Sequence, residues 1–381
     1  MKILFIQNYE TLAGSENYML HLLPAIAKTR SDISVEFLGV YKPGFEKEIN
    51  KYVSLLKERG IKAYKMKTIS YVSPTIFHSI NRFIKKRNYA IVHSHLIYAD
   101  FWIACIKKFI NNTFKSVSTL HSYQVKYYVE YALKPKELPK SLYFRLAKFA
   151  LNNIDVTYAC SYGLQNFYKQ AGLTDVDLPV IQHGFDYPEM LKKNHNNDLR
   201  YGKYQLTMVG RLIELKGHLI MLEIMPKLIE KYGDIHLVIL GEGSLKTTIN
   251  DIIKEKNLSK NVHVLGFKHN VLEYHTASDV AAFPSYCEGL PLSILEAMNC
   301  KTACVAFDTV GCNELIIDNE TGLLAKPFEA DSLFNCIVEL LDNKEKTNEL
   351  VDNAYIKLKQ YFTLDRMTKN TIALYEKLML S

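Results

Sequence analysis

Short β-rich apolar runs alternate with amphipathic stretches along almost the whole chain of 381 residues. In the first half the pattern predicts strands at 2–7, 35–40, 91–95, 116–120 and 156–160, and helices at 16–28, 45–59, 76–86 and 141–152. In the second half it predicts strands at 205–209, 236–240, 262–265, 280–283 and 302–306, and helices at 221–232, 245–256, 290–298 and 331–342. Such alternation is typical of parallel sheets with right-handed crossovers. We therefore expect an α/β protein with two doubly wound, Rossmann-like domains.

The length of the chain and one polar stretch divide it in two. A chain of this length is too long for one ordinary core, so two domains are expected. Residues 187–204 are rich in Asn, Lys and His and lack an apolar pattern, which indicates a linker. We expect an N-terminal domain at 1–187, a C-terminal domain at 188–363 and a last helix in 364–381. Parallel sheets bind ligands beyond the carboxyl ends of their strands, so two facing domains would form a cleft.

Composition argues against several classes of protein. The hydrophobic content of 48% with mixed charge is typical of a soluble globular protein. Residues 1–6 are a short apolar run with one Lys, which favours a buried first strand over a signal peptide. No apolar run approaches the 18 residues of a membrane span. The seven cysteines include no Cys-x-x-Cys pair, which favours reduced cytoplasmic thiols over disulfides or zinc.

The net charge of +7 is distributed unevenly. Residues 1–186 contain 25 Lys and Arg against 14 Asp and Glu, whereas the remainder contains 22 against 26. A basic first half suits an anionic lipid surface or a phosphate-bearing acceptor. No nucleic-acid recognition motif accompanies the charge, so nucleic acid is not expected as a partner. Ordinary solvated lysines are the alternative interpretation.

The segment Glu288-Gly-Leu-Pro-Leu-Ser-Ile-Leu-Glu296 carries the most specific chemistry. A helix that starts at Pro291 would place Glu296 one turn inside it and Glu288 on the preceding loop. The N–H groups of Leu292 and Ser293 would then be free to bind an anion at the helix N-terminus. An anion site between two carboxylates suits a nucleotide-sugar, which offers a diphosphate, ribose hydroxyls and sugar hydroxyls.

Three further strand ends in the second half carry a glycine, and the first of them also carries two cations. Gly210-Arg-Leu-Ile-Glu-Leu-Lys216 follows a strand, and its two cations suit phosphate oxygens. The alternative is a surface turn with solvated charges. Gly241 follows another strand, which alone is a common pattern. Gly266 and Phe267 follow the next one, where Phe267 either borders a nucleotide base or lies in the core.

In the first half, one glycine loop and two His-containing strand ends are candidates. Gly14 in Ala13-Gly-Ser-Glu16 permits close backbone approach to a phosphate, and helix capping by Ser15 is the competing interpretation. The pairs His93/His95 and His121/Ser122 each mark the end of a strand. We expect His121 to contact the transferred sugar or the acceptor, and His93 and His95 to be buried hydrogen-bonding residues.

Two other patterns have simpler alternative interpretations. Asp175-Val-Asp177 formally matches the Asp-x-Asp pattern of metal-dependent transferases, but it lies in an expected exposed loop, so no metal site is predicted. Residues 141–150 form a basic amphipathic stretch with aromatics on its apolar side, preceded by Lys and Tyr residues between 126 and 140. This composition suits a peripheral membrane contact, and an ordinary surface helix is the alternative.

Several segments in combination resemble the retaining glycosyltransferases of family 4, which have the GT-B fold. The resemblance runs over nearly the whole chain and is strongest from Val209 to Leu324. It rests on AGSE at 13–16, HGFD at 183–186, GRLIELKG at 210–217, EGLPLSILEAM at 288–298, and Gly311–Glu314 before the TGLL at 321–324. Two positions depart from the family pattern: Ala13 replaces the first Gly of a usual pair, and His183 stands where Asn is frequent.

The resemblance implies roles for these residues. The residues near the reacting centre would be Arg211, Lys216, Glu288 and His121, with the two cations on the donor diphosphate and Glu288 on the sugar hydroxyls. The donor-binding residues would be Gly14, Glu16, Gly210, Gly241, Gly266, Phe267, Gly289, Leu290, Leu292 and Glu296, with Glu296 on the ribose. Family members generally need no metal or other cofactor. The last helix would cross back onto the first domain.

The resemblance also implies a reaction. A sugar would pass from a nucleotide-sugar, expected to be UDP-linked, to a hydroxyl of a saccharide acceptor, with retention at the anomeric carbon. The basic aromatic first half favours a lipid-linked acceptor in cell-surface polysaccharide synthesis, with the protein in the cytoplasm or peripheral on the inner face of the membrane. Two alternatives stay open: a sugar-nucleotide epimerase of the same fold, and a non-catalytic nucleotide-sugar or membrane-surface binding protein.

Overall fold

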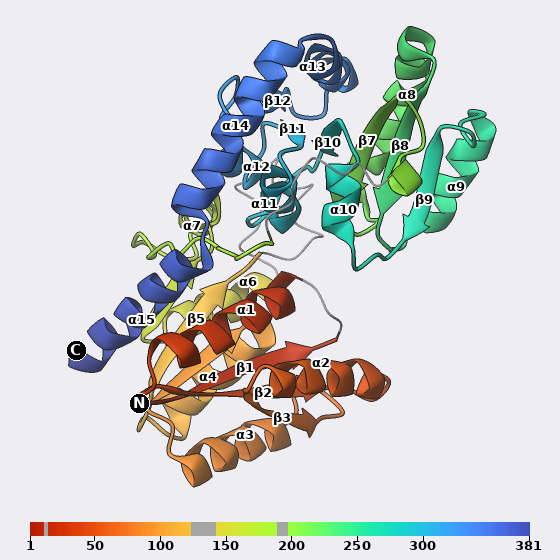
Figure 1. The fold of residues 1–381 in the computed structure, drawn as a ribbon. Coiled ribbons are helices and arrows are strands. Elements are labelled where there is room, and N and C mark those ends of the chain that lie inside the picture. Colours follow the sequence, from red (N-terminus) through yellow and green to blue (C-terminus); the bar gives the residue numbers. More distant parts are fainter. Residues whose placement is uncertain (11–13, 123–141, 189–196) are drawn as a thin grey trace. The chain divides into compact units, whose positions relative to one another are not determined.

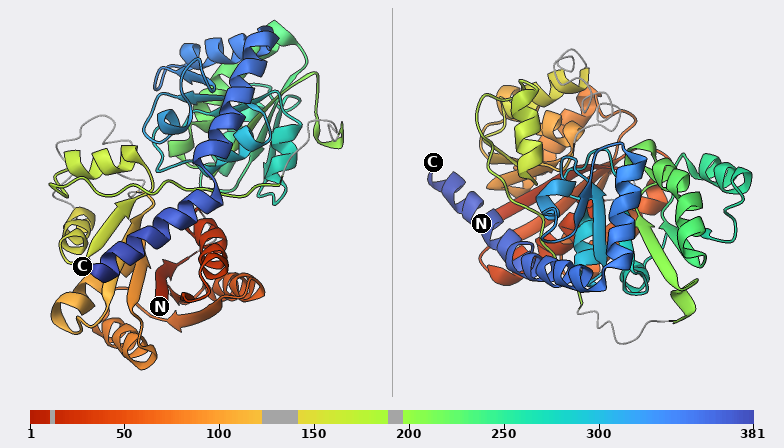
Figure 2. Two further views of the ribbon diagram at one scale, coloured as in Figure 1. Left: turned by 60° about the vertical axis from the view of Figure 1, so that its left-hand side comes forward. Right: turned by 90° about the horizontal axis from the view of Figure 1, so that it is seen from above.

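The computed structural model describes residues 1–10, 14–122, 142–188 and 197–381. Two parallel six-stranded sheets form the frame of the molecule (Figures 1 and 2). The first has the strand order β3-β2-β1-β4-β5-β6, made by β1 (Lys2–Tyr9), β2 (Ser34–Tyr41), β3 (Lys62–Lys67), β4 (Ile91–His95), β5 (Lys115–Leu120) and β6 (Val156–Ala159). The second has the order β12-β11-β10-β7-β8-β9, made by β7 (Tyr204–Val209), β8 (Ile235–Leu240), β9 (Val262–Gly266), β10 (Val280–Phe283), β11 (Ala303–Phe307) and β12 (Leu323–Ala325).

Helices connect the strands in each sheet. The helices of the first sheet are α1 (Gly14–Thr29), α2 (Glu46–Glu58), α3 (Pro74–Arg87), α4 (Ile97–Phe109), α6 (Leu142–Leu151) and α7 (Tyr162–Gln170). Those of the second are α8 (His218–Tyr232), α9 (Lys246–Glu255), α10 (Val271–Thr276), α11 (Leu292–Asn299), α12 (Cys312–Leu315), α13 (Ala330–Asp342) and α14 (Lys344–Tyr361). The expected architecture of two doubly wound Rossmann-like sheets is confirmed.

The chain divides into two compact units. Of the described residues, unit 1 contains 1–10, 14–122, 142–185 and 363–381, and unit 2 contains 186–188 and 197–362. In unit 1 the alternation of side chains along β1 serves two cores: Ile3 and Phe5 pack with α1 and α2, whereas Leu4 and Ile6 pack with α3 and α4. Burial on both faces explains why these strands are almost uninterrupted apolar runs.

The last helix, α15 (Leu364–Leu380), belongs to unit 1. It packs against α1, and Met367, Ile372, Tyr375 and Leu378 are buried in the same core as Ile3. At its surface the Arg30 guanidinium forms an ion pair with the Glu376 carboxylate. The C-terminal end of the chain is therefore part of the first sheet's packing.

Several elements differ from those expected. β3 was not predicted because three of its six residues are lysines, as is common on an edge strand. α4 was not predicted because apolar residues cover most of its surface, so it has no polar face to give a helical period. α11 begins at Leu292, with Pro291 as its N-cap rather than its first residue, so the expected helix start at Pro291 is wrong by one position.

All seven cysteines are free thiols. Among the described residues, no helix is long and apolar enough to cross a membrane.

Candidate functional site

The polar residues predicted in the second half gather at one place in unit 2. β7 lies between β10 and β8 in the sheet, so the connections that leave β7 and β10 run to opposite sides. Such a switch point leaves a crevice beyond the carboxyl ends of the strands, where doubly wound sheets bind ligands. Lys216 follows β7 and Glu288 follows β10. The strand order therefore brings two distant sequence motifs to the same switch point.

Lys216 and Glu288 form an ion pair across this switch point. Lys216 Nζ donates a hydrogen bond to Glu288 Oε1, and their side chains are only 18% and 12% exposed. Gly217 makes the approach of the two loops possible: its φ is +68°, and a Cβ there would lie 2.0 Å from the carbonyl oxygen of Pro284. The pairing of a buried cation and anion holds both charges at the crevice.

Arg211 supplies a second cation on the loop that leads from β7 to Lys216. It lies one residue beyond Gly210, whose N–H donates to the carbonyl oxygen of Leu240 at 3.0 Å. A Cβ on Gly241 would lie 1.9 Å from the Gly210 carbonyl oxygen, so the loops after β7 and β8 are in direct contact. Arg211 is exposed, and within the described residues its guanidinium makes no hydrogen bond or ion pair. A positive group without a partner at this edge is available to an anion.

The N-terminus of α11 lies on the segment that begins at Glu288. In the described part of the chain, the N–H groups of Leu292 and Ser293 have no acceptor, whereas the N–H of Ile294 donates to the Pro291 carbonyl oxygen at 3.1 Å. Gly289 and Leu290, which precede the helix, are buried. The two unpaired N–H groups add partial positive charge to the cations described above.

Glu296 lies inside α11, one turn from its start. Its surroundings raise the pKa of its carboxyl group to about 7, because burial disfavours the charged form. The same carboxyl group raises the pKa of Tyr187, after burial of the phenol itself. A carboxyl group of this kind can accept hydrogen bonds from ligand hydroxyls in either form, and a ligand that donates to it favours the ionised form.

The β9 loop is open to solvent. Gly266 adopts a φ of +71° and its carbonyl oxygen accepts from the N–H of Gly241 at 2.9 Å. Phe267, the next residue, is 59% exposed and contacts the ring of His269 edge-on. The alternative that placed Phe267 in the core is therefore wrong. An exposed flat ring at this edge can stack on a planar ligand.

In unit 1, histidines gather at the carboxyl ends of β4 and β5. His93 contacts Tyr375 Oη at 2.6 Å and Thr119 Oγ1 at 2.7 Å, so its predicted buried hydrogen-bonding role is confirmed. His95 Nδ1 lies 2.8 Å from His121 Nε2. Burial lowers the pKa of His95 and of His121 well below 6.5. His121 Nδ1 has no partner among the described residues, so a neutral imidazole offers one nitrogen to a ligand.

The β1–α1 connection has an internal role that the sequence did not indicate. α1 begins at Gly14, so Ser15 lies inside the helix and the alternative interpretation of Ser15 as a helix cap is wrong. Glu16 is 3% exposed, and its two oxygens accept hydrogen bonds from Gln7 and from Ser15. A Cβ on Gly14 would meet nothing within 4 Å. Glu16 is therefore used in packing β1 against α1, whereas the backbone at Gly14 stays approachable.

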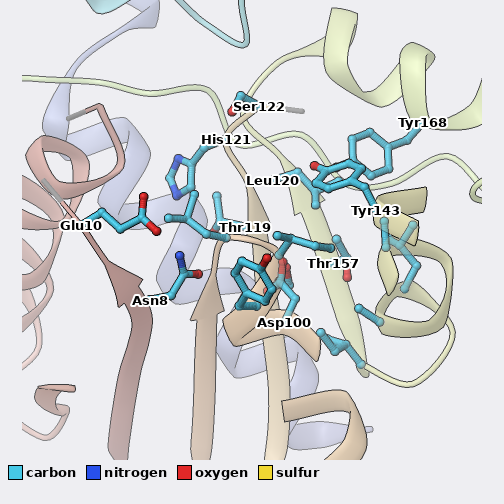
Figure 3. A pocket seen from close by; sticks show the side chains of 18 residues that line it. Asn8, Glu10, Asp100, Thr119, Leu120, His121, Ser122, Tyr143, Thr157 and Tyr168 are labelled. Atoms are coloured by element: carbon cyan, nitrogen blue, oxygen red, sulfur yellow. The ribbon is translucent and has the colours of Figure 1, made fainter. Parts of the chain in front are cut away.

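A pocket of about 360 Å³ lies beside this histidine cluster, wholly within unit 1. Figure 3 shows His121 and Glu10 on one side of it, Tyr143 and Tyr168 on the other, and Asp100 and Asn8 below. The sequence did not single out Asp100 or Thr157, which also lines the pocket. Asp100 resembles a common first-turn helix residue, so the only available signal was its place directly after a His-containing strand end.

The described residues include no metal site. Among them no group of three or more His, Cys, Asp or Glu side chains is arranged to hold a metal ion. Asp177, in the Asp-x-Asp pattern, forms an exposed ion pair with Lys169 at 2.8 Å. The Lys and Tyr residues between 126 and 140, predicted to precede a membrane-contacting helix, lie outside the described residues.

Two six-stranded Rossmann-like sheets are the architecture of GT-B proteins, and solved structures share it. Sucrose-phosphate synthase from Thermosynechococcus elongatus shares this fold with a TM-score of 0.82 over 100% of this chain and 99% of that one, at 20% identity. Residues 12–187 match the family described as Glycosyltransferase Family 4, and residues 191–357 match Glycosyl transferases group 1. The chain belongs to this family of glycosyltransferases.

Two characterised relatives are similar over part of the chain. A 4-alpha-N-acetylgalactosaminyltransferase of Campylobacter jejuni, named for the acceptor N-acetylgalactosamine-N,N'-diacetylbacillosaminyl-diphospho-undecaprenol, is 33% identical over 52% of this chain and 53% of its own length. The Escherichia coli UDP-Gal:alpha-D-GlcNAc-diphosphoundecaprenol alpha-1,3-galactosyltransferase is 30% identical over 46% of this chain and 48% of its own. The chain thus spans about half the length of each of these two relatives.

Proposed function

We propose that the protein transfers a sugar from a nucleotide-sugar to a hydroxyl group of a saccharide acceptor. The observation that carries this proposal is the buried Lys216–Glu288 pair at the switch point of unit 2. Arg211 and the unpaired N–H groups of Leu292 and Ser293 lie on the adjacent loops. These groups supply positive charge for a diphosphate and a carboxylate for sugar hydroxyls, in a chain that belongs to a glycosyltransferase family.

The donor is proposed to be UDP-linked. The Escherichia coli relative is named for UDP-Gal as its donor, and exposed Phe267 offers a flat surface for a base. In this proposal Arg211 and Lys216 bind the diphosphate. Phosphate oxygens approach the backbone at four glycines, which are Gly14, Gly210, Gly241 and Gly289. Glu296 accepts hydrogen bonds from the ribose. We assign donor binding to residues 188–363 and acceptor binding to 1–187 with the helix in 364–381.

The proposed chemistry is same-face transfer assisted by the leaving group. The acceptor oxygen bonds to the anomeric carbon as the bond from that carbon to the diphosphate oxygen breaks, and the departing diphosphate takes the hydroxyl proton. Charge develops on the diphosphate, so Arg211 and Lys216 lower the barrier by stabilising it. Glu288 is held by Lys216 and orients the sugar through its hydroxyls. Trapping of a glycosyl ester on Glu288 would contradict this route.

The acceptor is proposed to be a lipid-linked saccharide of cell-surface polysaccharide synthesis. Both characterised relatives are named for acceptors linked to undecaprenol through a diphosphate. The basic first half of the chain would favour work at an anionic membrane surface, on the cytoplasmic side where nucleotide-sugars are made. His121, with one free ring nitrogen, is proposed to contact the transferred sugar or the acceptor.

One experiment separates this proposal from the two alternatives. The protein is incubated with a panel of nucleotide-sugars, with and without a membrane lipid extract, and the products are separated. Transfer predicts release of the nucleoside diphosphate that is accelerated by the extract, together with a glycosylated lipid. An epimerase would instead change or release the sugar without any acceptor. Binding without turnover under all conditions would indicate a non-catalytic protein.

A further inference from the structure

The pocket beside His121 contains polar side chains to which the reaction proposed above gives no role. Asn8, Asp100 and Thr157 line it and are 8%, 4% and 7% exposed. Asn8 Oδ1 and Thr157 Oγ1 have no hydrogen-bond partner within the described residues. A buried polar atom without a partner costs free energy unless a ligand or water satisfies it. These atoms therefore indicate that the pocket takes a polar group.

Asp100 offers one of its two carboxyl oxygens to this pocket. Ser94 and Ser118 both donate their hydroxyl protons to Oδ1, at 2.6 and 2.8 Å. Oδ2 accepts no hydrogen bond from any described residue. Burial raises the pKa of this carboxyl to about 7, which agrees with the lack of a cation beside it. A ligand that donates an N–H or O–H to Oδ2 would complete the hydrogen bonding of Asp100.

The charge of the pocket argues against an anionic ligand. Its described lining residues include two carboxyl groups, Asp100 and Glu10, and neither lysine nor arginine. This composition contrasts with the surplus of basic residues in the first half of the sequence. A phosphate or a uronic acid would meet like charge without compensation. The pocket therefore suits an uncharged part of an acceptor.

The opposite wall of the pocket is apolar. α6 contributes Ala147, Ala150 and Leu151, and Ile154 follows the helix. The small alanine side chains leave room for a methyl group next to the polar side chains. Tyr143 and Tyr168 lie together on the same side of the pocket as α6 (Figure 3), where tyrosine rings can cover the face of a sugar.

We propose that this pocket binds the acetamido group of a 2-acetamido sugar at the acceptor end, an inference that rests on the proposed glycosyl transfer. The amide N–H donates to Asp100 Oδ2, the amide carbonyl accepts from the Thr157 hydroxyl, and the methyl group packs on Ala147 and Ala150. A hydroxyl in place of the acetamido group could bind Asp100, but it would leave Thr157 without a partner and the apolar wall without contact. The pocket thus selects acetamido over hydroxyl acceptors.

The test uses the full-length protein with UDP and two matched pairs of sugars. The pairs are the methyl glycosides of N-acetylglucosamine and glucose, and of N-acetylgalactosamine and galactose. Dissociation constants are measured by NMR titration. We expect one acetamido sugar to bind about tenfold or more tightly than its hydroxyl partner, in line with a hydrogen bond to a charged group. Equal binding within both pairs, or no binding of any of the four sugars, would overturn the inference.

Two variants test the assigned contacts. In the variant Asp100→Asn, the amide oxygen still accepts hydrogen bonds from Ser94 and Ser118, but an NH2 donor replaces the acceptor Oδ2. The preference for the acetamido sugar should therefore fall to less than about threefold. Ala147→Leu fills the methyl space, so the acetamido sugar should lose affinity while the hydroxyl sugar keeps it. Persistence of the preference in both variants would overturn the assignment.

A separate measurement keeps this inference distinct from the proposed function. Binding of UDP and slow hydrolysis of a UDP-sugar report on unit 2 and need no acceptor. Binding of UDP should be unchanged in Asp100→Asn and Ala147→Leu, and an unchanged thermal unfolding curve shows that unit 1 of each variant is folded. If the wild-type protein neither binds UDP nor hydrolyses any UDP-sugar, the proposed function fails. If it does both but shows no acetamido preference, only the pocket assignment fails.

Discussion

Lys216 donates a hydrogen bond from its ammonium group to Glu288, although the two residues are 72 positions apart in sequence. The pair is mostly buried, and Arg211 beside it has no partner among the described residues. One cation is therefore held in place before any ligand arrives, and the other is free to bind it. This difference leads to distinct expectations for the two residues.

We expect Arg211→Ala and Lys216→Ala to reduce turnover by about 100-fold or more, as for other groups that stabilise charge developing in a transition state. Arg211→Ala should leave the free energy of unfolding nearly unchanged, because the side chain is exposed and unpaired. Lys216→Ala should also destabilise the fold, because it leaves Glu288 without its cation. Release of the nucleoside diphosphate and urea unfolding measure the two effects.

Lys227 provides a matched control for Lys216. It forms an ion pair with Asp331 at 2.7 Å, but both side chains are more than half exposed. Lys227→Ala should change neither turnover nor stability by much, since exposed pairs contribute about 0–1 kcal/mol. Full activity in Arg211→Ala, Lys216→Ala and Glu288→Ala alike would show that the site lies elsewhere.

Glu296→Gln should change how stability depends on pH. The pKa of Glu296 is about 7 in the fold, against an ordinary value of 4.5. The folded state therefore holds this proton more tightly, and the stability gained from the neutral form is lost as pH rises from about 4.5 to 7. Glutamine cannot ionise, so the variant should match the wild type at pH 4.5 and exceed it at pH 8 by on the order of 2–3 kcal/mol. Urea unfolding at several pH values measures this.

The same substitution should weaken donor binding. If Glu296 accepts hydrogen bonds from the ribose, Glu296→Gln should reduce the affinity for UDP at pH 8 by about tenfold. Glu349→Gln is a suitable control, because Glu349 is exposed on α14. A variant that gains stability and keeps its UDP affinity would show that Glu296 is buried for packing alone.

Gly241→Ala should damage unit 2 far more than a comparable glycine substitution. Gly241 has a φ of +151°, and an added Cβ would lie 1.9 Å from the carbonyl oxygen of Gly210. Gly233 also has a positive φ of 69°, but an added Cβ would meet nothing within 4 Å. We expect Gly233→Ala to cost about 1 kcal/mol, and Gly241→Ala to cost at least twice as much and to abolish UDP binding. Similar melting temperatures for the two variants would contradict the loop contact.

Much of the fold was predictable because strands buried on both faces appear as uninterrupted apolar runs. The strand at Val280–Phe283 was expected and observed with the same bounds. β3 and α4 were not expected, because one is a lysine-rich edge strand and the other is apolar nearly all round. The spacing of apolar residues does not reveal a helix that is apolar on nearly all sides. Such a helix is recognised only once its packing against the sheet is known.

The candidate site was predictable as motifs but not as an arrangement. Lys216 and Glu288 were identified on separate segments, and their pairing depends on the position of β10 beside β7. Asp100 was missed for a similar reason: its partners Ser94 and Ser118 come from the neighbouring strands β4 and β5. A single sequence does not show which strands lie side by side, so a polar residue whose partners lie on other elements cannot be distinguished from a solvated one.

Phe109 should contribute to binding of an anionic membrane surface, if the acceptor is lipid-linked. It is 69% exposed at the end of α4, stacks on Phe149 of α6, and has the ammonium group of Lys108 above its ring at 5.5 Å. Exposed aromatic rings next to lysines are suited to an anionic lipid interface. Phe109→Ser should therefore lower co-sedimentation with anionic vesicles several-fold, whereas Ile356→Ser, at a 60% exposed position on α14, should not. Equal co-sedimentation of the two variants, or no binding of the wild type at low salt, would count against membrane contact through this surface.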